Sequence, residues 1–318
     1  MTFSIYSAAH DDVILPFQVE GLDVRGRLAR LGPVVDTILN RHAYPPAVSR
    51  VLGEMLLVAA LVGSALKFDG MFTVQTKGDG PVGLMVADFA TPGALRGYAQ
   101  FDADAVAALP EDAGVEQLLG GGYLALTIDQ GAHTERYQGI VALEGETIAA
   151  CAETYFRDSE QIATSLRLAV TRAAAGEPWH AGGIMIQHLP KAGTQAAPAE
   201  NLSGDAAENW RRAATLFATV TPAELTDRNL TPDRLLYRLY HEDGVRVFPS
   251  MDLAVGCRCN RQHIANVLSR FPESERAEMA VDGRIVVTCE FCSAGFAFDP
   301  ATIAAEGADD PAAEGPGA

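Results

Sequence analysis

The side chains with the clearest chemistry are four cysteines near the C-terminal end, gathered in two close pairs. Cys257 and Cys259 are separated by one residue, Cys289 and Cys292 by two, and 29 residues lie between the pairs. Only five cysteines occur in the 318 residues, so this clustering favours a shared chemical task over scattered burial. Four thiolates can complete the tetrahedral shell of a structural zinc ion, and close thiol pairs can also form disulfides. The pattern therefore predicts a metal site or a thiol redox site.

Two other potential ligands fit this chemistry less well. Cys151 stands alone in a run of good helix formers, which is typical of a buried structural thiol. His263 follows Cys259 by four residues and could replace a thiolate, but four cysteines already complete the zinc shell. We therefore assign neither Cys151 nor His263 to the site.

Composition argues against two kinds of partner. The formal net charge is −17, whereas proteins that bind nucleic acid normally present a basic face. An acidic surface also disfavours anionic membranes. The first residues do not resemble a secretory signal, and the longest near-continuous apolar stretch, residues 55–66, is expected to be too short to span a bilayer. We expect a cytoplasmic protein, in which the four thiols stay reduced and hold metal at rest.

The elements that must position the cysteines begin with a sheet domain in residues 1–190. A long apolar helix, predicted to be buried, follows Pro45-Pro46. Strands clustered together with helices grouped beside them predict the α+β class. The strand-like runs between turn residues are 71–76, 83–89, 95–101, 123–129 and 136–143.

A helical linker is predicted to join this domain to the cysteines. Residues 191–250 open with a polar stretch of small residues and continue as amphipathic helices, whose starts are marked by Thr221-Pro222 and Thr231-Pro232. Such short helices need a partner surface to hold their shape. Residues 251–300 then form a small four-cysteine zinc module, and residues 301–318 an acidic, disordered tail.

No enzyme motif accompanies the cysteines. Gly78, Gly80 and Gly83 match the G-x-G-x-x-G spacing of a dinucleotide-binding loop, but Pro81 and the strand-like run after it favour a hairpin turn. The sequence contains no H-E-x-x-H, G-x-S-x-G or Walker motif. We therefore expect a protein that is not an enzyme.

These segments together resemble the 33-kDa redox-regulated heat-shock chaperone (chaperonin) family. The resemblance rests on the two cysteine pairs within CRCNRQHIANVL and DGRIVVTCEFC, and it extends to LLYRLYHEDGVRVF, YFRDSEQIATSLRLAV, AGGIMIQHLP and LKFDGMFTVQTKGDGPVGLMVADF. It implies a holdase chaperone that binds unfolding proteins during oxidative stress. In the inactive, reduced form one zinc ion would be held by Cys257, Cys259, Cys289 and Cys292.

The resemblance also implies how the chaperone is activated. Oxidation would close the disulfides Cys257–Cys259 and Cys289–Cys292 and release the zinc, and the active form would be a homodimer. Zinc binding contributes about 10 to 16 kcal/mol of apparent folding free energy in zinc-finger peptides, so its loss should unfold a small module. The linker helices would then lose support and expose apolar surface for unfolded clients.

Two other classes of protein share the four cysteines. A zinc-ribbon nucleic-acid-binding protein would need basic residues interleaved with aromatic ones, but the arginines of residues 251–300 are offset by acidic residues. A thiol-disulfide oxidoreductase would place Cys289 and Cys292 at the start of a helix. Here the pair follows the strand-like residues 284–288 in a zinc-type context.

Overall fold

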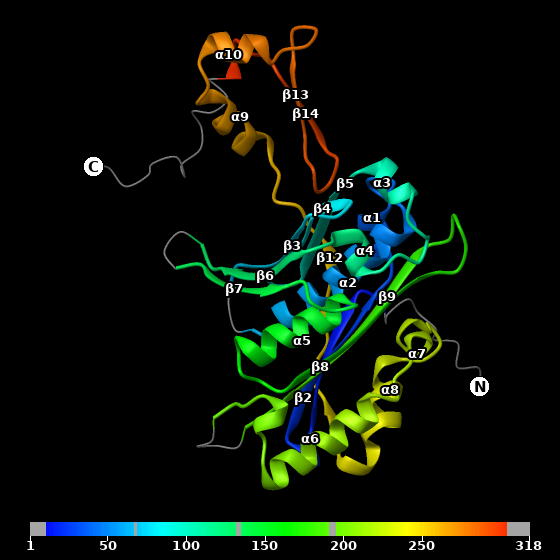
Figure 1. The fold of residues 1–318 in the computed structure, drawn as a ribbon. Helices are drawn as coiled ribbons and strands as arrows, with labels where there is room; N and C mark the ends of the chain where they lie inside the picture. The colour runs from blue at the N-terminus through cyan, green and yellow to red at the C-terminus, as the bar shows by residue number, and fades with distance from the viewer. Residues whose placement is uncertain (1–10, 67–68, 132–134, 191–194, 304–318) are drawn as a thin grey trace, which may run out of the picture. The chain divides into compact units, whose positions relative to one another are not determined.

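The computed structural model describes residues 11–66, 69–131, 135–190 and 195–303 (Figure 1). The chain divides into two compact units, Met1–Gly256 and Cys257–Ala318. The first unit combines two sheets with packed helices, and the described part of the second contains two helices and a hairpin. The predicted α+β class is confirmed.

The first sheet has six strands in the order β10-β1-β2-β9-β8, with β11 also paired to β1. All of its neighbours are antiparallel. Because β8 is the last strand of the order, it forms an edge of the sheet. The strands are β1 (Val13–Val19), β2 (Val24–Leu31), β8 (Thr164–Arg172), β9 (Trp179–His188), β10 (Val245–Val247) and β11 (Met251–Asp252).

The second sheet has the order β12-β5-β4-β3-β6-β7, and its strands β3 to β7 are those predicted from the middle of the sequence. The turn between Gly78 and Val82 joins two antiparallel strands, so the predicted hairpin is confirmed and no phosphate-binding loop forms there. The strands are β3 (Met71–Gly78), β4 (Val82–Ala90), β5 (Ala94–Phe101), β6 (Gly122–Asp129), β7 (Tyr137–Ala142) and β12 (Ala254–Val255).

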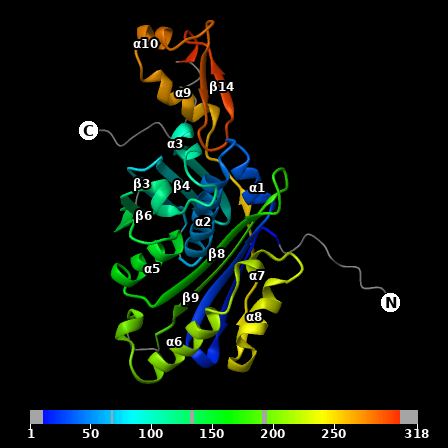
Figure 2. The same cartoon turned by 45° about the vertical axis from the view of Figure 1, so that its right-hand side comes forward.

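The helix α1 (Pro33–Leu39) is followed in sequence by α2 (Pro46–Gly63), which forms the centre of the larger hydrophobic core. The helix α2 packs against strands of both sheets (Figure 2). Length and hydropathy alone would let it cross a membrane, but 83% of its apolar window is buried inside the protein. The predicted burial is confirmed. The start of α2 at Pro46 agrees with the helix predicted after Pro45-Pro46.

Shorter helices complete this core. The Thr147 hydroxyl accepts a hydrogen bond from the Ala150 N–H and so caps α5. This helix lies beside the edge strand β8 and carries Cys151 into the core. The helices are α3 (Ala103–Ala107), α4 (Val115–Leu119) and α5 (Ile148–Asp158), and the described residues also include the 3-10 turns η1 (Glu20–Leu22), η2 (Ala199–Asn201) and η3 (His241–Asp243).

Three helices of the linker, α6 (Gly204–Phe217), α7 (Pro222–Thr226) and α8 (Pro232–Tyr240), cover the other face of the first sheet. Thr221 and Thr231 stand at the N-caps of α7 and α8 with proline directly after them, as predicted. The start of α6 was not predicted, since it lies within the stretch described above as polar. Packing against the sheet stabilises the helix there, because Trp210, Ala213 and Phe217 share one buried face.

A second hydrophobic cluster therefore joins the linker helices to the sheet. One side of this cluster consists of side chains from the strands, and the other side consists of side chains from the linker helices. The buried members on the strands include Phe17, Val19, Val24, Leu28, Ile184 and Ile186, and those on the linker include Trp210, Phe217, Leu225, Leu235, Leu236 and Tyr240.

The second unit has a far smaller core. It contains α9 (Arg261–Ser269), α10 (Glu273–Glu278) and the hairpin of β13 (Ile285–Thr288) with β14 (Gly295–Phe298). The predicted tail from residue 304 onward lies outside the described residues. Up to residue 303, where the description of this unit ends, its buried hydrophobic residues are Ala265, Leu268, Ile285, Phe298 and Ile303.

Candidate metal centre

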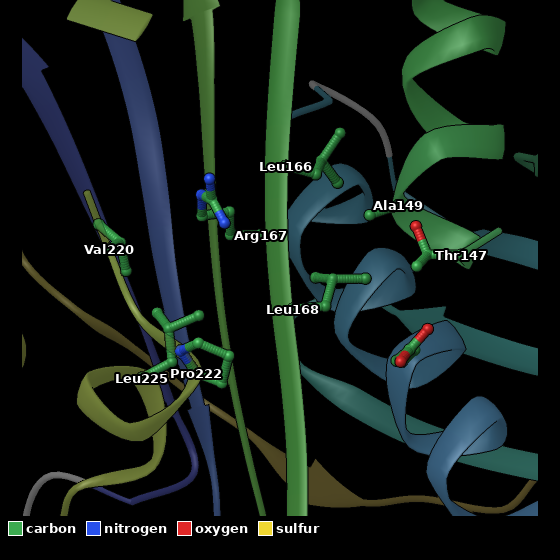
Figure 3. Close-up of a pocket in the computed structure, with 9 residues that line it drawn as sticks. Thr147, Ala149, Leu166, Arg167, Leu168, Val220, Pro222 and Leu225 are labelled. Atoms are coloured by element: carbon green, nitrogen blue, oxygen red, sulfur yellow. The ribbon is translucent and has the colours of Figure 1, made fainter. Parts of the chain in front are cut away.

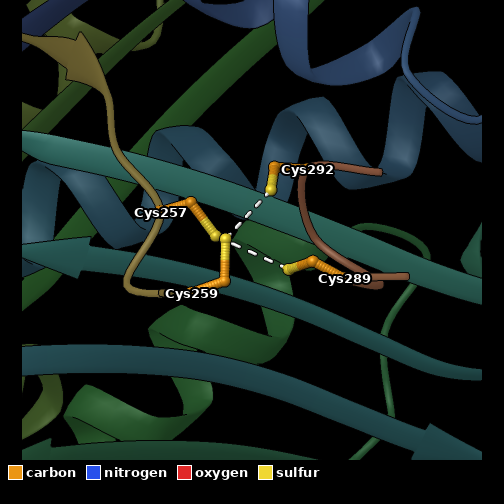
Figure 4. A group of neighbouring side chains, drawn as sticks. All are labelled: Cys257, Cys259, Cys289 and Cys292. Carbon is orange, nitrogen blue, oxygen red and sulfur yellow. Dashed lines mark hydrogen bonds between the residues drawn. The ribbon is translucent and has the colours of Figure 1, made fainter. Parts of the chain in front are cut away.

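The four clustered cysteines meet in the second unit with their sulfur atoms pointing toward one another (Figure 4). All four sulfurs lie within 4.8 Å of one another. The Sγ atoms of Cys257 and Cys289 are 3.7 Å apart, and those of Cys259 and Cys292 are 3.3 Å apart. A zinc ion with bonds of about 2.3 Å to four thiolates has sulfur separations of about 3.8 Å. The donor set therefore fits a tetrahedral zinc ion.

Local backbone structure holds each cysteine pair in place. The first pair directly precedes α9, whose N-cap residue Asn260 accepts a hydrogen bond of 2.6 Å from the His263 N–H. The second pair forms a turn after β13, in which the Cys289 N–H donates to the Ala294 carbonyl and the Ser293 N–H to the Cys289 carbonyl. A helix start and a strand end thus present two thiols each.

The thiols influence one another electrostatically. Burial opposes ionisation of Cys257, but the Cys259 backbone N–H and the surrounding thiols outweigh it and lower the pKa of Cys257 to about 6. Burial, together with hydrogen bonds to Cys292 and Cys257, raises the pKa of the Cys259 thiol. Burial likewise raises the pKa of Cys292. One thiolate forms readily and opposes the next, so full ionisation of the cluster calls for a cation.

The structure separates the cluster from the other two residues considered as ligands. Within the described residues, the donor group that could hold a metal consists of the four cysteines and does not include His263. Cys151 is 0% exposed in the core of the first unit, and burial raises the pKa of its thiol. Its position is that of an unreactive core residue.

Sequence reasoning did not name the surface that the linker helices cover. Alternating apolar residues of β1 and β2, such as Phe17 and Val19, carried the signal, because side chains two apart share a face of a strand. At the edge strand β8 the cover is incomplete. A cavity of about 170 Å³ remains there, lined by residues that include Leu168, Pro222 and Leu225 (Figure 3).

The fold and site define a class of protein: a large α+β unit without an enzyme motif, followed by a small unit whose four thiols form a metal-type cluster. The family model described as Hsp33 protein matches residues 12–299, nearly the whole chain. The chain therefore belongs to the Hsp33 family, and the resemblance inferred from its sequence is confirmed.

Relatives agree with this assignment. A 33 kDa chaperonin of Caulobacter vibrioides is 47% identical over 296 residues, which cover 91% of this chain and 95% of the relative. A 33 kDa chaperonin of Ectopseudomonas mendocina is 37% identical over 290 residues, covering 91% of this chain and 92% of the relative. These names place the chain among chaperones, a non-enzymatic class, as predicted.

A solved structure supports the fold. The crystal structure of the 33 kDa chaperonin from Thermotoga maritima matches with a TM-score of 0.77, covering 93% of this chain and 97% of that chain. The two sequences are 24% identical, so the match bears on the fold alone.

Proposed function

We propose that this protein is a redox-regulated holdase, which binds unfolding proteins under oxidative stress and is inactive while reduced and zinc-bound. The observation that carries the proposal is the cluster of four sulfurs within 4.8 Å of one another in a unit whose own buried core is small. A bound zinc ion would supply much of the folding free energy of such a unit. Cys257, Cys259, Cys289 and Cys292 are the proposed ligands of one zinc ion per chain.

Oxidation removes these ligands in pairs. In the proposed step, the two thiolates of a pair lose two electrons and form one S–S bond. Hydrogen peroxide accepts the electrons, and with two protons its O–O bond breaks to give two waters. The proposed disulfides are Cys257–Cys259 and Cys289–Cys292, the pairing that membership of the Hsp33 family implies. A disulfide sulfur is a poor zinc ligand, so the oxidised cysteines would no longer hold the ion.

Release of the linker then exposes the client-binding surface. The chain from α8 to Cys257 runs through the short strands β10, β11 and β12, which pair with β1 and β5 of the first unit. In the proposed sequence of events, unfolding of the second unit loosens these short strands and then the helices that precede them. Short helices hold their shape by packing. Their departure would expose both their own apolar faces and the sheet floor beneath them, and exposed apolar patches of this kind bind unfolded chains.

The proposal includes the working context of the chaperone. Residues 1–190 act as the core domain, residues 191–250 as the releasable linker and residues 251–300 as the redox module. Unfolded or partly folded proteins are the clients, the active form is a homodimer, and the compartment is the cytoplasm. Nucleic acid and membranes are not partners, in keeping with the net charge of −17.

The test measures zinc release, free thiols and chaperone action on the same samples. The reduced protein should hold one zinc ion and leave a heat-unfolding client to aggregate, as followed by light scattering. After peroxide and mild warming it should lose four free thiols together with the zinc and suppress aggregation. Equal suppression by the reduced protein, or zinc retained after oxidation, would contradict the proposal. Salt-sensitive RNA binding by the reduced protein would favour the zinc-ribbon alternative instead.

A further inference from the structure

A buried arginine of the first sheet binds the linker through hydrogen bonds. Arg30 lies in β2 on the same face as Val24 and Leu28, which belong to the cluster under the linker helices. Its side chain is charged, yet the residue is only 4% exposed. A charge buried this deeply in an apolar cluster requires partners that replace water.

The partners of Arg30 all come from the end of α7 and the turn after it. The guanidinium Nη1 donates to the Asp227 carbonyl over 2.6 Å. Nη2 donates over 2.9 Å each to the carbonyls of Glu224 and Leu230. The last carbonyls of a helix have no partner within the helix, so Arg30 satisfies groups that α7 cannot satisfy itself.

A glycine opposite Arg30 lets α7 come close enough. Gly182 in β9 is the register partner of Arg30 across the two strands. A Cβ built on Gly182 would lie 2.0 Å from the Leu225 carbonyl oxygen, which is backbone and cannot swing aside. The backbone of α7 therefore rests directly on the sheet at Gly182, while the neighbouring guanidinium binds its carbonyls.

We propose that Arg30 and Gly182 form a docking site for α7 that keeps the client-binding face of the first sheet closed, with Arg30 as the positioning residue that sets how firmly the linker is held. The inference rests on the proposed function of that face. Undocking would return both the guanidinium and the three carbonyls to water, so polar contacts hold the segment in place without making its release prohibitive.

The contact between Arg30 and α7 is polar and charged, unlike the apolar packing around it. Burial lowers the pKa of Arg30, and the nearby carboxylates of Asp11 and Asp227 act in the opposite direction, which keeps the guanidinium charged. The same segment is also tied to the sheet domain by an ion pair between Arg228 and Asp11, whose atoms are 3.4 Å apart. These polar contacts gather on one short stretch of the linker.

The test compares two variants of the full-length, reduced, zinc-loaded protein with the wild type. Arg30→Met keeps the length of the side chain but removes its donors, and Gly182→Ala wedges α7 from the opposite strand. In both, amide hydrogen exchange in residues 221–231 should rise at least about tenfold, since buried carbonyls lose partners or are pushed off the sheet. Zinc content and the protection of residues 257–303 should match the wild type, and the reduced variants should suppress client aggregation.

Matched controls use the same substitutions on the opposite face of the same strands. Arg27→Met and Gly183→Ala change residues on the other face of β2 and β9, where Arg27 is half-buried and a Cβ at Gly183 would meet the Leu61 and Leu168 side chains. Neither control should raise exchange selectively in residues 221–231. Because Gly183 is buried and Arg27 half-buried, these controls separate a general loss of stability from an effect on α7.

The possible results divide clearly. Unchanged exchange in residues 221–231 of both variants would overturn the docking site. Raised exchange without chaperone action, alongside an active peroxide-treated wild type, would overturn the claim that α7 keeps the face closed. Raised exchange with an inactive peroxide-treated wild type would support the docking site and contradict the proposed function, so the two failures are distinguishable.

Discussion

At the scale of single residues, four thiols within 4.8 Å of one another set the chemistry of this protein. The pKa of Cys257 is lowered to about 6, whereas the pKa values of Cys259 and Cys292 are raised. The Cys257 thiolate is therefore available near neutral pH, and Cys259 and Cys292 would ionise when a metal cation compensates their charge. This is the expected behaviour of a shell that binds zinc and releases protons.

Replacement of one ligand tests the assignment. Cys259→Ala leaves three thiolates, so the protein should lose zinc to a chelator that the wild type resists, with affinity lower by at least about tenfold. Competition with a chromogenic chelator measures this. Cys151→Ala is the control and should leave zinc content and peroxide activation unchanged, because Cys151 lies in the core of the first unit. Loss of zinc from Cys151→Ala would mean that the wrong thiols were assigned.

A buried carboxyl on α2 makes the stability of the first unit depend on pH. Burial raises the pKa of Glu54 from its ordinary 4.5 to about 7, although Arg50 and the Ile148 N–H act in the opposite direction. The folded protein thus holds this proton more tightly than the unfolded chain. Its contribution to stability is fully present below about pH 4.5 and is lost as the pH rises through about 7.

Glu54→Gln removes this dependence. The stability of the variant relative to the wild type should rise by about 2 to 3 kcal/mol between pH 5 and pH 8, which is most of the full effect expected at about 1.4 kcal/mol per pKa unit. Urea unfolding across this range measures the difference. Parallel stability curves for the two proteins would show that the Glu54 carboxyl ionises normally in the folded state.

At the scale of elements, the linker helices have clear N-terminal signals in the sequence but are too short to be stable without packing. Thr221 accepts a hydrogen bond from the Glu224 N–H, and the Glu224 carboxylate accepts one from the Thr221 N–H, which completes a capping box at α7. The helix has five residues and therefore relies on this cap and on its contacts with the sheet.

Loss of the cap should ease release of the linker. Thr221→Ala is expected to destabilise α7 by about 1 kcal/mol, so that hydrogen exchange in residues 221–231 rises about fivefold and activation needs less warming. Thr231→Ala is a matched control, because Thr231 stands at the N-cap of α8 without a side-chain cap bond. Equal effects of the two substitutions would contradict a specific role for the α7 cap.

The sequence predicted those elements whose signal is local. Periodicity-two runs such as residues 71–76 became strands, and proline after threonine marked the starts of α7 and α8. The start of α6 at Gly204 escaped prediction, because its helix depends on Trp210 and Phe217 meeting a sheet formed by distant strands. The hydrogen bonds from Arg30 to the α7 segment could not be predicted for the same reason, since about 200 residues separate Arg30 from Leu230.

The cysteine site was more predictable than the surface it is proposed to control. Spacing alone indicated that the four thiols share one site, because two close pairs of cysteines can be recognised without knowing the fold. The proposed client surface is built from strands β1, β2 and β9, whose contributions meet only in the folded sheet. Its position therefore came from the structure.

At the scale of the whole molecule, two units with very different cores should differ in how strongly loss of metal affects their stability. The first unit has two extensive hydrophobic clusters, and the second has five buried hydrophobic residues in its described part. Removal of zinc by a chelator under reducing conditions should therefore unfold residues 257–303 while the sheets of the first unit stay protected. Cooperative loss of protection in both units would contradict this division of stability.

The central claim is that loss of the four-thiolate zinc site uncovers the sheet face beneath the linker. The most direct measurement is hydrogen exchange on one preparation before and after peroxide with mild warming, read in the second unit, in α6 to α8 and in α2. The account predicts loss of protection in residues 257–303 and 204–240, with α2 unchanged. Full protection of residues 204–240 in a fully oxidised, zinc-free protein would contradict it.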